Sequence, residues 1–283
     1  MTTYVQPAQA ATGRSAIDVT VGGQRLRTST AAPVPIAEGL RVRWLLAAKL
    51  LQVEHGATPA SSMMAAAVAL AAWAFYTARG TQEYGWNVGR WPCGPEDTTC
   101  VNLGATGQHV VLAVFPDAVA GWRTWWATVN GSNLGGAPLL WLYGRGELAA
   151  VWHSMGTTQV SWAALVDAYA WVRSTLLAGG APAAVLPAVP SRDELGQAAA
   201  RVRVDAFVAE WVRAHPSGAA RGQGEGGAVP SGGATGGGVV SSPSPAPTPA
   251  TPVTTTARRS SGGGVLLLLA LGLLAASSSR KRR

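Results

Sequence analysis

The sequence is poor in the residues that metal centres and nucleophilic active sites require. It has four histidines, at dispersed positions, and two cysteines in 283 residues. No phosphate-binding glycine loop, zinc-ligand spacing or Ser-His-Asp arrangement occurs in it. We therefore expect neither a metal nor a cofactor.

Basic residues are also scarce where the aromatic residues are concentrated. The net charge is +8, but six basic residues lie after position 257: Arg258, Arg259, Arg280, Lys281, Arg282 and Arg283. The rest of the chain is close to neutral. A nucleic-acid-binding domain concentrates arginine and lysine on a folded face, so we expect no nucleic-acid partner.

The two cysteines lie close together in sequence. Cys93 and Cys100 bracket the turn-rich segment Gly-Pro-Glu-Asp-Thr-Thr, which predicts a disulfide bond. Closing so short a loop would stabilise the fold by about 2–3 kcal/mol on the chain-entropy model, and the bond would persist in an oxidising compartment. Two reduced thiols in a cytosolic protein are the alternative.

Tryptophan marks the extent of the folded part. All twelve tryptophans fall between Trp44 and Trp211, whereas later residues are dominated by Gly, Ser, Pro, Thr, Ala and Val. We predict one folded domain. The expected divisions are an N-terminal segment (1–33), a helical domain (34–215), a disordered linker (216–264) and a C-terminal hydrophobic helix with a basic tail (265–283).

The pattern within these divisions predicts an all-α fold. Gly22-Gly23 separates two short alternating runs, which predicts a small hairpin in the N-terminal segment. Apolar spacing predicts helices at 36–53, 63–76, 116–129, 139–155, 161–177 and 191–215. The 63–76 helix is apolar on every side, which indicates a central buried position. Residues 81–108 are expected to form a long loop.

Details of the last helix also follow from its sequence. Ser191-Arg192-Asp193-Glu194 predicts a capping box at its start. The residues predicted to form its buried stripe are Leu195, Ala199, Val202, Phe207, Val208 and Trp211.

The C-terminal region predicts a membrane partner. Residues 265–276 are rich in leucine, and about twenty uncharged residues, reaching residue 279, are just enough to span a bilayer. The alternative is a sorting tail that is removed. The terminal Arg-Lys-Arg-Arg favours an extracytoplasmic domain, but residues 1–30 lack the pattern of a secretory signal. The export route and a cytoplasmic location of the domain therefore stay open.

Two consecutive segments carry a resemblance to a known family. An alanine-rich helix ends in Phe-Tyr-Thr-Ala-Arg-Gly at residues 75–80, and the loop Tyr-Gly-Trp-Asn-Val-Gly-Arg follows at residues 84–90. Together they resemble the motif of the bacterial glucosaminidase family of peptidoglycan hydrolases, in which the helix ends in Glu-Thr-Gly-x-Gly and the loop reads Asn-x-Gly-Asn. The resemblance covers about residues 58–175. It implies a lysozyme-like helical fold, a place in the bacterial cell envelope and peptidoglycan as partner.

The chain departs from this motif at the catalytic acid. Tyr76 stands where the family has its glutamate, and a phenol with a pKa near 10 is a weaker proton donor than a carboxylic acid. The resemblance therefore implies a catalytic position with impaired hydrolysis, unless Tyr76 only packs or stacks. Glu83 is the nearest carboxylate in the loop. It is either a replacement acid or a solvated loop charge.

The other site candidates are sugar-contacting residues. Asn87 and Gly89 match the family's loop, whereas Arg90 replaces its second asparagine. Trp86, Trp91 and Trp162 are candidates for stacking on sugar rings, with core packing as the alternative. Three functions remain open: peptidoglycan binding with impaired hydrolysis, an active hydrolase that uses a carboxylate such as Glu83, and a structural or protein-interaction domain on a membrane stalk.

Overall fold

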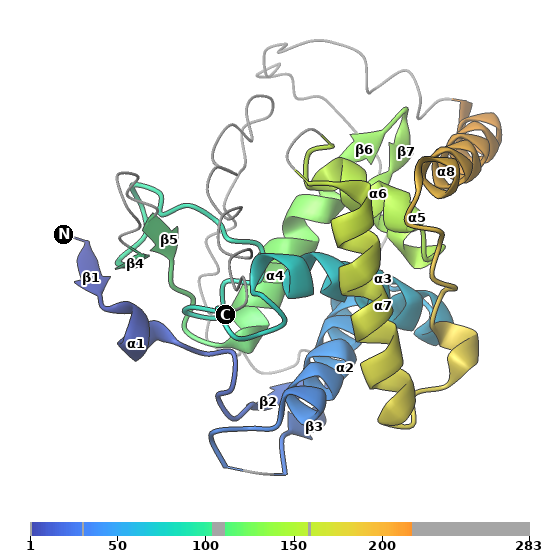
Figure 1. Ribbon diagram of the computed structural model, residues 1–283. Coiled ribbons are helices and arrows are strands. Elements are labelled where there is room, and N and C mark those ends of the chain that lie inside the picture. The colour runs from blue at the N-terminus through green and yellow to red at the C-terminus, as the bar shows by residue number, and fades with distance from the viewer. Residues whose placement is uncertain (1, 30, 104–110, 158–159, 217–283) are drawn as a thin grey trace, which may run out of the picture. The chain divides into compact units, whose positions relative to one another are not determined.

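The computed structural model describes residues 2–29, 31–103, 111–157 and 160–216 (Figure 1). The chain divides into two units, residues 1–222 and 223–283. The described residues all belong to the first. The predicted linker (216–264), apart from Pro216, and the predicted C-terminal helix (265–283) lie outside the described residues.

The described residues are mostly helical, with three small sheets. The helices are α1 (Pro7–Ala10), α2 (Ile36–His55), α3 (Pro59–Tyr76), α4 (Ala118–Asn130), α5 (Leu139–Gly144), α6 (Leu148–Ser154), α7 (Trp162–Ala178) and α8 (Glu194–Ala214), with a short 3-10 helix, η1 (Ala183–Val185). The strands are β1 (Thr3–Val5), β2 (Asp18–Val21), β3 (Gln24–Arg27), β4 (Thr99–Asn102), β5 (Val111–Ala113), β6 (Asn133–Leu134) and β7 (Ala137–Pro138). The predicted fold is therefore confirmed as mostly helical, but it has more strands than the one hairpin that the sequence predicts.

Helix α3 lies at the centre of the hydrophobic core, as its sequence predicts. It packs against α2, α5 and α7, and its residues from Ala65 to Ala74 are all buried. The Thr58 hydroxyl caps its start by accepting a hydrogen bond from the Ser61 N–H at 3.2 Å. Among the described residues, α3 is also the one helix long and apolar enough to cross a membrane by length and composition.

The predicted helix at 139–155 is two helices. Helix α5 ends at Gly144, and Gly146 follows with φ of 75°. A left-handed glycine ends a helix without the steric cost that other residues have in this conformation. The chain therefore turns between α5 and α6.

Helix α8 buries only part of the predicted stripe. Asp193, and not Ser191, caps it by accepting from the Gly196 N–H at 2.7 Å. The buried residues are Gly196, Ala200 and Val204, whereas Leu195 and Val202 are 80% and 67% exposed. Phe207 and Val208 of the predicted stripe are partly buried and pack against the core. The most buried residues are nevertheless the three others, where α8 packs against α6 and β7.

The N-terminal segment joins the helical domain through sheet pairing. Strand β1 pairs in parallel with β4, which pairs antiparallel with β5, and Figure 1 shows these three strands together. Part of the predicted 81–108 loop is thus a strand, because a distant segment supplies its hydrogen-bonding partner. The predicted hairpin is confirmed as β2 and β3, joined at Gly22-Gly23.

Candidate functional site

Tyr76 is the last residue of α3 and is half-buried. Its ring packs edge-on against Phe75, with ring centroids 5.6 Å apart. Burial raises the pKa of the Tyr76 phenol to about 12, and the nearby charge of Arg90 partly opposes this rise. At neutral pH the side chain is therefore a protonated phenol, which is both a weak acid and a poor nucleophile.

The segment that follows Tyr76 has an unusual backbone. Among the described residues, the non-glycine residues with positive φ are Ala78, Arg79, Trp86 and Arg90. Such conformations cost energy for side chains with a Cβ and persist where the surroundings enforce them. Tight packing enforces one of them: a Cβ on Gly121 of α4 would lie 2.1 Å from the Trp86 carbonyl oxygen.

Glu83 is buried and paired with an arginine from α2. The Arg43 Nη2 to Glu83 Oε2 distance is 2.5 Å, and both side chains are 1% exposed. The prediction of a solvated loop charge at Glu83 is therefore wrong. The same burial argues against the prediction of a replacement acid, because an enclosed carboxylate does not reach a substrate.

The Arg43 guanidinium group lies against two tryptophan rings. Its Cζ lies 5.3 Å from the Trp73 ring centroid and 5.4 Å from that of Trp86. Contacts of this kind between a cation and an aromatic face are attractive, and more so when desolvated. Arg43 also donates to the carbonyl oxygens of Gly39 at 3.3 Å and Thr12 at 3.1 Å. The arginine thus joins α2, α3, the loop and the N-terminal segment.

Thr12 completes this connection. Its N–H donates to the Glu83 carbonyl oxygen at 2.9 Å, and its hydroxyl accepts from the Trp86 N–H at 3.0 Å. The backbone around Glu83 and Trp86 is therefore fixed by a residue about seventy positions earlier in the chain. The resemblance, which begins near residue 58, did not include this part of the site.

Asn87 is fully engaged by the protein backbone. Its side-chain amide donates to the carbonyl oxygens of Trp91 and Ala113, both at 2.9 Å, and its Oδ1 accepts from the Trp91 N–H at 2.7 Å. Both donors of the amide and its acceptor are thus occupied, and the side chain is buried. Asn87 holds the loop against β5 and has no donor left for a sugar.

The two loop tryptophans keep part of their surface exposed. Trp86 and Trp91 are both half-buried, and the Trp91 ring lies 6.2 Å from that of Trp125 on α4. Gly89 packs directly against the Trp91 indole, because a Cβ at Gly89 would lie 2.8 Å from that ring. Both residues thus keep part of their surface accessible, although the Trp91 indole nitrogen is buried.

Trp162 is a packing residue, contrary to the prediction of a sugar contact. It is 4% exposed, and its indole N–H donates to the Ser191 carbonyl oxygen at 2.9 Å. Its ring packs edge-on against Trp152 with centroids 5.7 Å apart. The first residue of α7 is thus used to anchor the segment that leads to α8.

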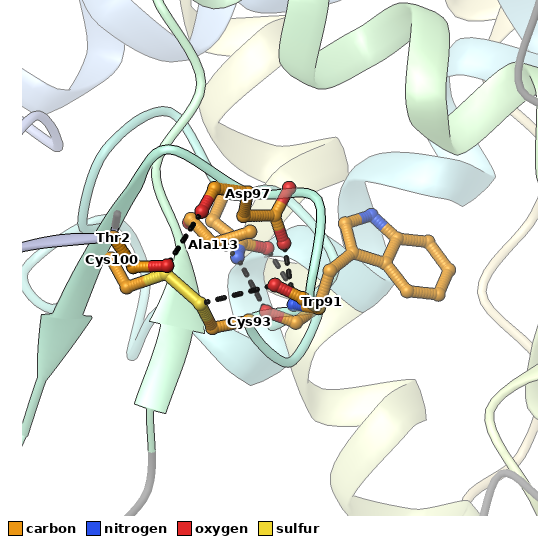
Figure 2. The surroundings of a disulfide bond; sticks show 8 residues. Thr2, Trp91, Cys93, Asp97, Cys100 and Ala113 are labelled. Carbon is orange, nitrogen blue, oxygen red and sulfur yellow. Dashed lines mark hydrogen bonds between the residues drawn. A yellow bond between two sulfur atoms is a disulfide. The ribbon is translucent and has the colours of Figure 1, made fainter.

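The disulfide between Cys93 and Cys100 is present, with Cα atoms 5.9 Å apart (Figure 2). Inside the closed loop the Asp97 carboxylate accepts from the Gly94 N–H at 2.6 Å, and the Asp97 carbonyl oxygen accepts from the Thr2 hydroxyl at 3.2 Å. Figure 2 shows the Trp91 indole directed away from the disulfide. The bond therefore ties β4 to the segment that carries Trp91 without contacting the ring itself.

Sequence reasoning missed one buried carboxylate. Glu147 precedes α6 and is 7% exposed. Burial raises the pKa of Glu147, although Arg203 on α8, at 3.5 Å, opposes the rise. Nothing in the local pattern marks this position, because its burial depends on where α8 packs.

In the part of the chain that the structure describes, no group of three or more His, Cys, Asp or Glu side chains is placed to hold a metal ion. The fold and site define a mostly helical domain in which a buried ion pair positions an aromatic loop beside the end of a central helix. Comparison with protein-family models, with curated proteins and with solved structures finds no match.

Proposed function

We propose that this domain binds the glycan strands of peptidoglycan through the end of α3 and the 83–91 loop, with hydrolysis impaired. The observation that carries the proposal is the contrast within the loop. Its carboxylate, Glu83, is buried in an ion pair, whereas Trp86 and Trp91 are partly exposed. Indole faces can stack on sugar rings, but an enclosed carboxylate does not deliver a proton to a glycosidic oxygen.

The chemistry of Tyr76 supports the same division between binding and catalysis. With its pKa raised to about 12, the phenol is further from the range useful for general acid catalysis than an exposed tyrosine. A positioned carboxylic acid contributes about a hundredfold to ten-thousandfold in rate. The loss of such a group accounts for the impaired hydrolysis that we propose.

The disulfide supports a location in the cell envelope. Disulfide bonds form and persist in oxidising compartments and are rare in the cytosol, and Cys93 is bonded to Cys100. We propose that the domain lies outside the cytoplasmic membrane and is attached to it through residues 265–279. The burial of Glu83 argues against the active hydrolase that would use it.

Binding to insoluble peptidoglycan, measured by co-sedimentation alongside the release of reducing ends, tests the proposal. The full chain in detergent is the right sample, because Thr12 belongs to the site. We expect sedimentation without release. Trp86→Ala and Trp91→Ala should each weaken binding by about tenfold, given about 1–3 kcal/mol for one stacked ring. Trp141→Ala removes a half-buried tryptophan on α5 and is the matched control.

Other outcomes would select a different function. Release of reducing ends that disappears in Glu83→Gln, while thermal unfolding shows that this variant is still folded, would indicate an active hydrolase. An absence of both binding and release would indicate a structural or protein-interaction domain. Tyr76→Glu provides a further test. If this variant hydrolyses peptidoglycan while the wild type does not, position 76 corresponds to the position of the catalytic acid in the family motif.

A further inference from the structure

A pocket of about 250 Å³ lies between α6, α8 and β6. These elements lie side by side in Figure 1. Its lining includes Leu134, Ala149 and Val204 as apolar walls and Trp152. Ala149, Trp152 and Val204 are buried. The interior is thus apolar, as in most small-molecule sites.

Polar side chains surround the mouth of this pocket. They are His153 and Thr157 at the end of α6, and Arg201 and Asp205 on α8. All four are exposed. Within the described ranges, none of them makes a side-chain hydrogen bond or ion pair with another described residue. Their hydrogen-bonding capacity is therefore available to a ligand.

Arg201 and Asp205 have an unusual relationship. They lie one turn apart on α8, a spacing at which opposite charges commonly pair on a helix surface. Arg201 instead lies over the Trp152 ring, with its Cζ 4.8 Å from the centroid. A guanidinium group that lies over an aromatic ring can still donate its N–H groups to a carboxylate. One positive and one negative charge therefore flank the same apolar pocket without neutralising each other.

This arrangement selects for a ligand that carries both charges. A simple anion would be repelled by Asp205 and a simple cation by Arg201, whereas a zwitterion is attracted by both. At about 250 Å³ the pocket is smaller than the pockets of about 300–1,000 Å³ that hold drug-sized ligands, so it suits a smaller molecule. The apolar walls require a hydrocarbon side chain on that molecule.

We propose that this pocket binds a free α-amino acid with a small or medium apolar side chain. The ligand carboxylate lies on Arg201, the ammonium group on Asp205, and the side chain enters between Leu134, Ala149 and Val204. Trp152 has its indole N–H occupied by the Val160 carbonyl oxygen at 2.6 Å, so it orients Arg201 and contributes contact area. The site shares no residue with the proposed glycan surface and does not depend on it.

Calorimetric titration of the full chain in detergent with L-alanine and L-leucine tests this site. We expect both amino acids to bind, and N-acetyl-leucine and leucinamide, each lacking one charge, to bind at least about tenfold more weakly, because a charge-assisted contact contributes about 1.5–3 kcal/mol. Arg201→Gln and Asp205→Asn should each weaken leucine binding to the same extent. Arg213→Gln, which removes an exposed arginine of α8 outside the pocket, should leave it unchanged.

Thermal unfolding of each variant guards against loss of structure, which exposed substitutions of this kind rarely cause. Any of three results would overturn the inference. The first is that neither amino acid binds at millimolar concentration. The second is unchanged leucine affinity in both Arg201→Gln and Asp205→Asn, and the third is equal affinity for leucine and its two singly charged derivatives.

Discussion

Arg43 on α2 and Glu83 in the loop after α3 form an ion pair of 2.5 Å in the protein interior. The rings of Trp73 and Trp86 each lie against the Arg43 guanidinium group. The pair fixes the loop to two helices at once, and Trp86 is part of the enclosure. The position of Trp86 is thus set by Arg43 and Glu83, which are themselves buried.

Glu83→Gln should lower the free energy of unfolding by about 3–5 kcal/mol, because it leaves the Arg43 charge buried without a counter-charge. Urea unfolding followed by tryptophan fluorescence measures the change. Glu54→Gln is the control, since Glu54 pairs with the exposed Arg123 at 2.6 Å and such surface pairs contribute about 0–1 kcal/mol. Equal effects of the two substitutions would contradict a structural role for the buried pair.

Asn87→Asp should be strongly destabilising although the side chains have the same shape. The new carboxylate would face the carbonyl oxygens of Trp91 and Ala113, to which the amide now donates. Leaving buried polar groups unpaired costs about 1–3 kcal/mol each, so we expect a loss of at least about 2 kcal/mol in urea unfolding. Asn133→Asp, at an exposed position of β6, is the control. An Asn87→Asp protein as stable as the wild type would contradict this structural role and make Asn87 a candidate ligand-binding residue again.

Replacing both cysteines, in Cys93→Ser with Cys100→Ser, should lower the free energy of unfolding by about 2–3 kcal/mol, because the unfolded chain regains the entropy of an open loop. A reductant should reduce the stability of the wild type to that of the double variant. The same reductant should have no effect on the double variant. If reductant does not change the free energy of unfolding of the wild type, the disulfide bond does not stabilise the protein.

Glu147→Gln should stabilise the protein slightly at pH 7, with less effect near pH 4. Burial raises the pKa of Glu147 in the folded state, so the folded protein holds this proton more tightly than the unfolded chain does. The stability that this provides is present below the unfolded pKa and is lost as pH rises through the folded value. Thermal unfolding at both pH values measures the difference, and a gain that is larger at pH 4 would reverse the assigned sign.

The helical elements could be predicted because their signals are local. Helix α3 has apolar residues on all sides and a threonine-proline start, and both features appear unchanged in its burial and capping. The hairpin at Gly22-Gly23 and the disulfide also follow from neighbours in sequence. The exceptions are the break between α5 and α6, and the part of the predicted α8 stripe that is exposed at Leu195 and Val202.

The sequence by itself determined that the segments of α2, α3, α4, α7 and α8 are helical, that α3 is central, and that Cys93 pairs with Cys100. Each of these depends on residues a few positions apart. Only the tertiary structure decided that Glu83 is buried against Arg43, that the Asn87 side chain hydrogen-bonds to the backbone, and that β1 pairs with β4. A residue's type gives its polarity and hydrogen-bonding capacity. Its partner is set by which distant segment packs beside it.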